Sequence, residues 1–185
     1  MKARSAISIL DASLLALLGG CASIGAGPLV PDALKVPESQ TLSLRTHATG
    51  VQIYECKANQ DDPTKFEWSL KGPEADLFDH SGRKIGKHYA GPTWESNDGS
   101  KVVGEVKARD NGANANAIPW LLLVAKSTSG DGVLSKTKSI QRVETSGGKA
   151  PAGGCDATQL RTETRVPYKA TYYFYAARSA SDGGM

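Results

Sequence analysis

Residues 88–99 (HYAGPTWESNDG) bring together side chains that could form a ligand site. His88, Tyr89 and Trp94 supply flat rings, and Glu95 adds a carboxylate directly after the indole. Sugars and other polar small molecules are held by this combination, an apolar face with a few directional hydrogen bonds. We name these four residues as the candidate ligand site. The simpler alternative is that Trp94 packs in the core while the Asn-Asp-Gly that follows turns the chain.

The histidines offer a second kind of chemistry. His47, His80 and His88 could together bind zinc or copper and leave a position open for a catalytic water. No two of them have the i, i+2 spacing that places ligands side by side on one strand face, and only a tight hairpin would bring His80 near His88. The simpler alternative is three ordinary surface or hydrogen-bonded histidines. The chain has no HExxH, GxSxG, Walker-type or EF-hand motif, so the sequence indicates no cofactor.

Short alternating runs of apolar and polar residues must position these groups. Such runs, separated by turn residues, are typical of β-strands, and no convincing helical spacing follows residue 20. Ser81-Gly82 and Asn97-Asp98-Gly99 predict two hairpins. The predicted strands are residues 41–47, 51–56, 66–70, 76–80, 84–89, 93–95, 102–108, 118–125, 132–134, 139–144 and 170–177. We therefore expect an all-β fold, a single-domain antiparallel β-sandwich or barrel of about ten strands.

Two of the three cysteines are predicted to pair with each other, and the third lies near the N-terminus. Cys56 and Cys155 lie in the β-rich part of the chain, and we predict that they form a disulfide in an oxidising compartment. Because the closed loop is long, such a bond would stabilise the fold by up to about 4.7 kcal/mol in the chain-entropy model. A redox-active or metal-bound thiol pair is the alternative, but no CxxC spacing supports it.

Residues 1–20 have the order of an export signal. A basic start at Lys2 and Arg4 is followed by an apolar run and by Gly19 and Gly20, and the run is shorter than the about 20 residues of a membrane span. Residues 18–21 (LGGC) resemble the lipobox of bacterial lipoproteins. That resemblance implies cleavage before Cys21, lipidation of its thiol, and attachment to the periplasmic face of the outer membrane. An ordinary secretory signal, with the protein periplasmic or secreted, is the alternative.

Length and charge set the remaining limits. The chain has 185 residues and a formal net charge of +3, which suits a single domain and gives no reason to expect nucleic acid as a partner. We predict a signal peptide at residues 1–20, a lipid-anchored flexible tether at 21–37, one β domain at 38–178 and a disordered tail at 179–185. The sequence names no oligomeric state.

Several strings in order resemble a known family. VQIYEC, HYAGPTWE, AIPWLLL, SIQRV with GGKAP, and VPYKATYYFYAAR are together similar to the domain of unknown function 3455, a family of uncharacterised exported proteins. The resemblance covers residues 36–178 and implies export and a β-rich domain. It supplies no catalytic or binding residues.

These observations favour a binding role. We expect a non-enzymatic lipoprotein domain of the bacterial cell envelope that binds a small molecule, a glycan or a protein partner. The alternatives are a secreted enzyme, metal-assisted or active on carbohydrate, and a purely structural envelope component. A concave pocket lined by Trp94, Tyr89 or the tyrosines of residues 170–177 would distinguish the binding role from the structural one.

Overall fold

The computed structural model describes residues 27–179. The predicted signal peptide, the lipidation site at Cys21 and all but the first residue of the predicted tail lie outside the described residues.

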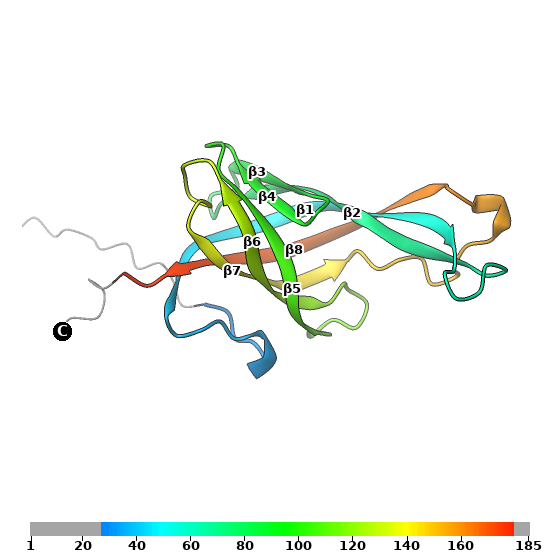
Figure 1. Ribbon diagram of the computed structural model, residues 1–185, viewed down its shortest axis with the longest axis horizontal. Coiled ribbons are helices and arrows are strands. Elements are labelled where there is room, and N and C mark those ends of the chain that lie inside the picture. Colours follow the sequence, from blue (N-terminus) through cyan, green and yellow to red (C-terminus); the bar gives the residue numbers. More distant parts are fainter. Residues whose placement is uncertain (1–26, 180–185) are drawn as a thin grey trace, which may run out of the picture.

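The described chain forms one sheet of eight antiparallel strands that closes into a barrel (Figure 1). The strands follow one another around the ring in chain order, and the last pairs with the first. They are β1 Gln40–Ala58, β2 Phe66–Phe78, β3 Lys84–Tyr89, β4 Thr93–Ser96, β5 Lys101–Asp110, β6 Trp120–Ser129, β7 Thr137–Gly147 and β8 Glu163–Ala177. Two short 3-10 helices, η1 (Asp32–Leu34) and η2 (Ala157–Gln159), accompany them, and no described helix is long and apolar enough to cross a membrane. The all-β prediction is confirmed, and the architecture is the barrel.

The described ring has fewer strands than predicted because two pairs of predicted strands each form one continuous strand. Residues 41–47 and 51–56 belong to the single strand β1, which passes through Gly50 without turning. A Cβ at Gly50 would lie 2.2 Å from the Glu74 carbonyl oxygen of β2. Glycine is needed at this position because two strands approach closely, not because the chain turns.

Strand β2 joins two predicted strands in the same way. Residues 66–70 and 76–78 lie in one strand, whose register with β1 shifts by one residue next to Gly72. Such a bulge bends a strand without ending it. Residues 132–134, predicted as a strand, form part of the β6–β7 loop instead. The two predicted hairpins are confirmed as the β2–β3 and β4–β5 connections.

Alternation along the strands separates the inside of the barrel from the outside. In β8, Tyr172 and Phe174 belong to the interior core, whereas Tyr173 and Tyr175 belong to a separate cluster on the outer face. The interior core also contains Trp94, Ile140 and a set of smaller apolar side chains, Ala48, Ala75, Leu77, Val102, Ile118, Leu121, Leu123, Leu134, Tyr168 and Ala170. The barrel interior is thus largely filled by side chains, as expected for eight strands.

One end of the barrel is closed by short connections. Because the strands run antiparallel in chain order, the β2–β3, β4–β5 and β6–β7 connections all lie at this end. Leu134 of the β6–β7 loop is fully buried, and its backbone N–H donates to Ser100 Oγ at 3.1 Å. Ser100 Oγ in turn donates to the Asp98 carboxylate, which also accepts from the Val133 N–H. The β4–β5 and β6–β7 connections are thus joined by hydrogen bonds at this end.

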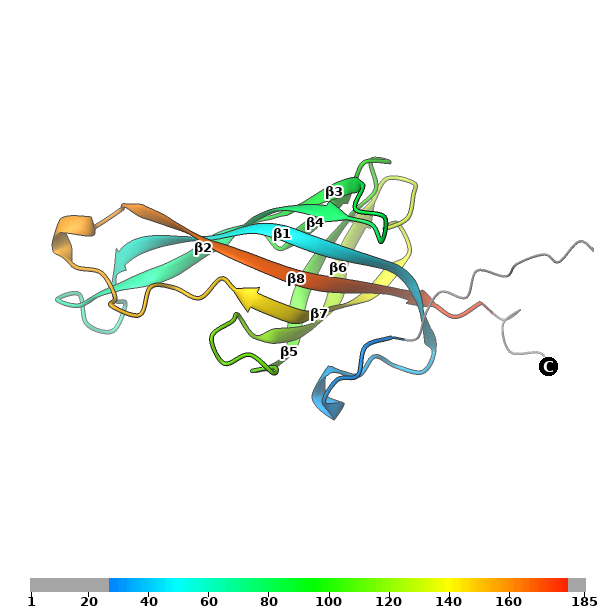
Figure 2. The same cartoon turned by 180° about the vertical axis from the view of Figure 1, so that it is seen from behind.

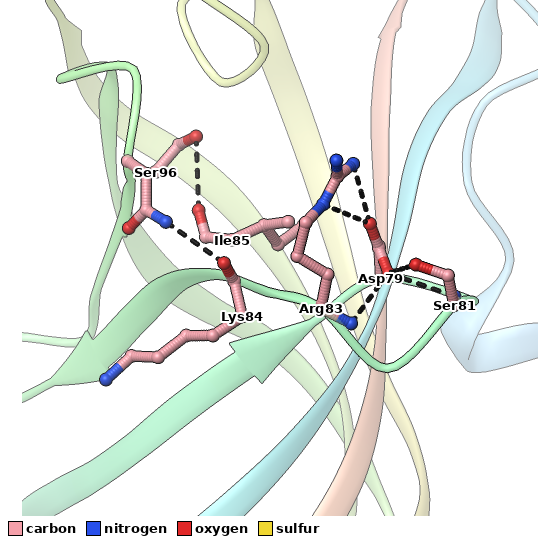
Figure 3. Close-up of polar contacts among 7 residues, drawn as sticks. Asp79, Ser81, Arg83, Lys84, Ile85 and Ser96 are labelled. Atoms are coloured by element: carbon pink, nitrogen blue, oxygen red, sulfur yellow. Dashed lines mark hydrogen bonds and ion pairs between the residues drawn. The ribbon is translucent and has the colours of Figure 1, made fainter.

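The β2–β3 hairpin at the same end is ordered by Asp79 (Figure 3). Its carboxylate accepts hydrogen bonds from the N–H and hydroxyl of Ser81 and from the backbone and side chain of Arg83. These bonds, the Ser81 hydroxyl first, lower the pKa of Asp79 to about 2. Ser96 donates from its hydroxyl to the Ile85 carbonyl oxygen across the β3–β4 pair.

The end of the predicted tether lies against the barrel wall. Leu34 is fully buried, and its carbonyl oxygen accepts a hydrogen bond from Gln141 Nε2 at 2.6 Å. Val30 and Val36 pack on the outer cluster that contains Tyr173 and Tyr175. Residues 27–37 therefore pack against the barrel, with η1 beside β5 and β6 and with Val30 and Val36 on the outer cluster of β7 and β8, and this part of the predicted flexible tether is a packed piece of the domain.

The opposite end of the barrel carries a long arm. β1, β2 and the start of β8 extend beyond the other strands (Figures 1 and 2). The predicted disulfide between Cys56 and Cys155 is present here and joins the end of β1 to the β7–β8 loop. The Trp68 indole N–H donates to the Gly154 carbonyl oxygen at 2.7 Å and ties the same loop to β2. The β7–β8 loop is therefore bonded to both β1 and β2 within the arm.

Candidate functional site

A cavity of about 350 Å³ lies inside the barrel at the end that carries the arm. The β3–β4 turn and the segment before β6 border it, with Leu70 and Lys71 of the arm at its rim. Every strand contributes to its wall: Gln52 from β1, Pro73 from β2, His88 from β3, Trp94 from β4, Val106 from β5, Leu121 from β6, Arg142 from β7 and Tyr172 from β8. The cavity is within the size range of small-molecule sites in proteins.

An aromatic cluster forms one wall of this cavity. His88 and Trp94 are cross-strand partners on β3 and β4, and their rings stack with 4.2 Å between centroids. Tyr172 meets both rings edge-on, at 5.2 Å from His88 and 5.3 Å from Trp94. Each of the three side chains is at least 98% buried. The cluster is rigid, since each ring is held by the other two.

His88 is neutral in this wall. Its Nδ1 lies 2.9 Å from the Thr93 carbonyl oxygen, and because a carbonyl can only accept, Nδ1 carries the proton. Burial lowers the pKa of His88 to about 3, with the nearby charge of Arg142 acting in the same direction. The imidazole therefore adds no positive charge to the cavity.

Arg142 is one of three cations that line the cavity, with Lys71 and Arg109, and it is the one that is partly buried rather than exposed. It lies in a row with its cross-strand neighbours Leu121 and Tyr172, and it is partly buried. Its Nε and Nη2 donate to the Pro119 carbonyl oxygen at 3.1 and 2.8 Å. None of the ion pairs among residues 27–179 includes Arg142, and the cavity lining contains no Asp or Glu.

Polar atoms without partners lie in the same wall. In the described structure, Gln52 Nε2 and Trp94 Nε1 are buried and have no hydrogen-bond partner. By contrast, the Tyr54 hydroxyl donates to the Gly148 carbonyl oxygen at 2.7 Å. Burial raises the pKa of the Tyr172 hydroxyl, with Arg142 opposing it, so this phenol stays protonated. The wall is consequently rich in hydrogen-bond donors.

The four residues of the predicted ligand site do not gather at one place. They lie on strands β3 and β4 rather than in a loop, so alternate side chains point in opposite directions. His88 and Trp94 line the cavity. Tyr89 and Glu95 lie on the outer face, where the Tyr89 hydroxyl donates to Glu95 Oε2 at 2.8 Å. Lys87 and Lys101 surround this carboxylate, whose pKa is lowered chiefly by the Tyr89 hydrogen bond.

The three histidines of the predicted metal site are not assembled. Among residues 27–179, no group of three or more His, Cys, Asp or Glu side chains is arranged to hold a metal ion. His47 is exposed on β1 and contacts Thr171 Oγ1 at 3.3 Å through Nδ1, whereas His88 is buried in the aromatic wall. His80 is exposed in the β2–β3 hairpin, whereas His88 lies at the other end of β3 and lines the cavity.

The sequence did not identify Gln52, Arg142 or Leu121 as residues that line the cavity. No local motif marks these residues, because they come from strands far apart in the chain. The available signal was the polar type of Gln52 and Arg142 at inward positions of strands whose neighbours are apolar. A polar residue at such a position is either satisfied within the core or faces a cavity.

Comparisons with known proteins identify the family of the chain but no activity or ligand. Neither the curated proteins nor the solved structures contain a match to the chain. A family model described as a protein of unknown function (DUF3455) matches residues 37–176, which span all eight strands. The match also agrees with the strings in residues 36–178 on which the sequence resemblance depends. The chain therefore belongs to the DUF3455 family.

Proposed function

We propose that the protein is a binding barrel that takes a small, largely apolar molecule into the cavity at its open end. The observation that carries this proposal is the cavity itself, about 350 Å³ in volume and bordered by all eight strands. Its lining is mainly aliphatic and aromatic, with a few polar groups, which is the usual composition of a ligand pocket. A purely structural envelope component has no need of such a space.

We further propose that this binding takes place in the bacterial cell envelope. The signal-like residues 1–20 and the lipobox-like residues 18–21 support export and lipid attachment at Cys21. The Cys56–Cys155 disulfide supports an oxidising compartment. The protein is then a carrier or receptor domain on the periplasmic face of the outer membrane, acting without catalysis.

Two flat aromatic probes test the binding role. Isothermal titration of the purified full chain with 2-naphthoate and with its neutral amide, 2-naphthamide, should show saturable binding of at least one of them, with one probe per chain. Native mass spectrometry of the protein taken from its own envelope should show a small molecule of the same stoichiometry. If neither probe binds, the proposed function is overturned.

A pair of matched variants locates the binding. Val106 lines the cavity and is 37% exposed, whereas Val124 lies on the outer face and is 38% exposed. Val106→Trp should fill part of the cavity and weaken probe binding by about tenfold or more, while Val124→Trp should leave it unchanged. Equal effects of the two substitutions, or no effect of either, would place binding elsewhere and contradict the proposal.

A further inference from the structure

We infer that the ligand is an organic acid, and that Arg142 receives its acidic group inside the barrel. This inference rests on the proposed function and names the chemistry of the same cavity. Arg142 has five N–H donors, and its Nε and Nη2 donate to the neutral carbonyl oxygen of Pro119. The guanidinium charge is thus held in place but not balanced by any described carboxylate.

The contrast with the outer surface supports an anionic partner. Among the described residues, nine lysines and arginines pair with carboxylates, as Arg165 does with Glu74 at 2.8 Å, and unpaired ones such as Lys126 and Lys169 are exposed to water. Within the barrel, a cation of the same kind stands among eighteen lining residues without one Asp or Glu. A partly buried charge is costly unless an opposite charge or strong hydrogen bonds compensate it. The carboxylate of a bound acid would supply the opposite charge that Arg142 lacks.

The groups around Arg142 favour an acid over a base or a neutral polar molecule. Trp94 Nε1 is a donor without an acceptor in the same wall, and Gln52 Nε2 is another. His88 stays neutral because burial lowers its pKa, so the imidazole adds no charge beside the guanidinium. Arg109 at the rim adds a further positive charge, and among residues 27–179 it takes part in no ion pair. A cationic ligand would be repelled by the guanidinium groups of Arg142 and Arg109.

The rest of the cavity fits the body of such a molecule. Ile118, Leu121 and Leu123 add aliphatic surface to the lining, which also contains the stacked rings of His88 and Trp94. An apolar or aromatic body would contact these side chains while its carboxylate contacts Arg142. The ligand class is therefore an amphipathic organic acid, either an aromatic acid or a short fatty acid.

The matched probes distinguish this inference from the proposed function. 2-Naphthoate and 2-naphthamide share one apolar body and differ in charge, so the ratio of their dissociation constants measures the demand for an acid. We expect naphthoate to bind about 10- to 100-fold more tightly at pH 7, the strength of a hydrogen bond to a charged group. Equal binding of the two probes, or tighter binding of the amide, overturns the acid inference while the binding function stands. If neither binds, the binding function itself is overturned.

Substitution of the arginine identifies the receiving group. Arg142→Gln should remove the preference for naphthoate, and Arg142→Lys, which keeps a charge, should retain part of it. Arg165→Gln removes a positive charge from the outer surface and should leave the preference intact. A preference that persists in Arg142→Gln overturns the role of Arg142. Circular dichroism and thermal melts establish that each variant is folded, and the probe ratio of the unsubstituted protein tests the inference without any variant.

Discussion

The imidazole of His88 lies flat against the indole of Trp94, with 10° between the two ring planes. The two residues sit directly opposite each other on β3 and β4, and Tyr172 of β8 closes the cluster edge-on. β8 is not a neighbour of either strand in the sheet, so the contact crosses the inside of the barrel. Three rings thereby join opposite walls and hold the shape of the cavity beside them.

His88 makes the stability of the barrel depend on pH. In the unfolded chain a histidine binds its proton near pH 6.5, whereas burial keeps folded His88 neutral down to about pH 3. Between these values the unfolded state binds more protons, so the free energy of unfolding falls as the pH is lowered. The expected loss is up to about 1.4 kcal/mol for each pH unit, to be measured by urea unfolding between pH 4 and pH 7.

Two substitutions separate this effect from that of the carboxylates. His88→Gln should flatten the pH dependence between about pH 4 and pH 6.5, even if it lowers the stability at neutral pH. His80→Gln changes an exposed histidine in the β2–β3 hairpin and should leave the slope as it is. A slope that is the same in all three proteins would show that His88 does not titrate as the structure requires.

The hydrogen bonds of Ser100 should contribute strongly to the stability of the closed end. Among the described residues, its hydroxyl oxygen accepts the hydrogen bond of the buried Leu134 N–H. Ser100→Ala leaves that N–H without an acceptor, which costs about 1–3 kcal/mol of unfolding free energy. Ser135→Ala, which removes a serine hydroxyl bonded to Gly132 within the same loop, should cost clearly less. Equal losses in chemical denaturation would argue against the special role of Ser100.

The disulfide should stabilise the arm and, through it, the rim of the cavity. Replacing both Cys56 and Cys155 with serine is expected to lower the unfolding free energy by about 2–5 kcal/mol. Because Leu70 and Lys71 of the arm border the cavity, probe affinity should also fall. Non-reducing mass measurement of the mature protein should find both cysteines oxidised. Free thiols at both positions would refute the bond.

Cys21 should decide where the protein resides. If its thiol is lipidated, Cys21→Ala releases the protein from the membrane fraction, which cell fractionation followed by immunoblotting detects. Metabolic labelling with a radioactive fatty acid should mark the unsubstituted protein and not the variant. A variant that stays in the membrane fraction, or an unsubstituted protein that takes up no label, would contradict lipid attachment.

Local patterns were sufficient for much of the fold. The alternation in residues 170–177 separates Tyr172 and Phe174 from Tyr173 and Tyr175, and the structure places the two pairs on opposite faces. The glycine at position 50 was misleading because glycine serves both turns and close strand contacts. Only the position of Glu74, on the neighbouring strand, decides between these two roles.

The cavity was only partly within reach of the sequence. Residue type identifies Trp94 and His88, but it also groups them with Tyr89 and Glu95, which are close in sequence and lie on the same two strands. Strand alternation sends the second pair outward. Gln52 and Arg142 line the same cavity but are 90 positions apart in the sequence. Whether they line one cavity depends on how the strands pair around the barrel, and local sequence patterns do not determine that pairing.

Gly27 lies against the hydroxyl of Tyr175, near the closed end, where a Cβ would come within 2.7 Å of it. Gly27 lies only six positions after Cys21 in the sequence, which limits the distance between the two to about 20 Å. An anchor at Cys21 would therefore hold the barrel by its sealed end and leave the mouth facing away from the lipid. Ligand would then enter from the aqueous side, so the protein would collect molecules in transit across the periplasm rather than extract them from the bilayer that carries it.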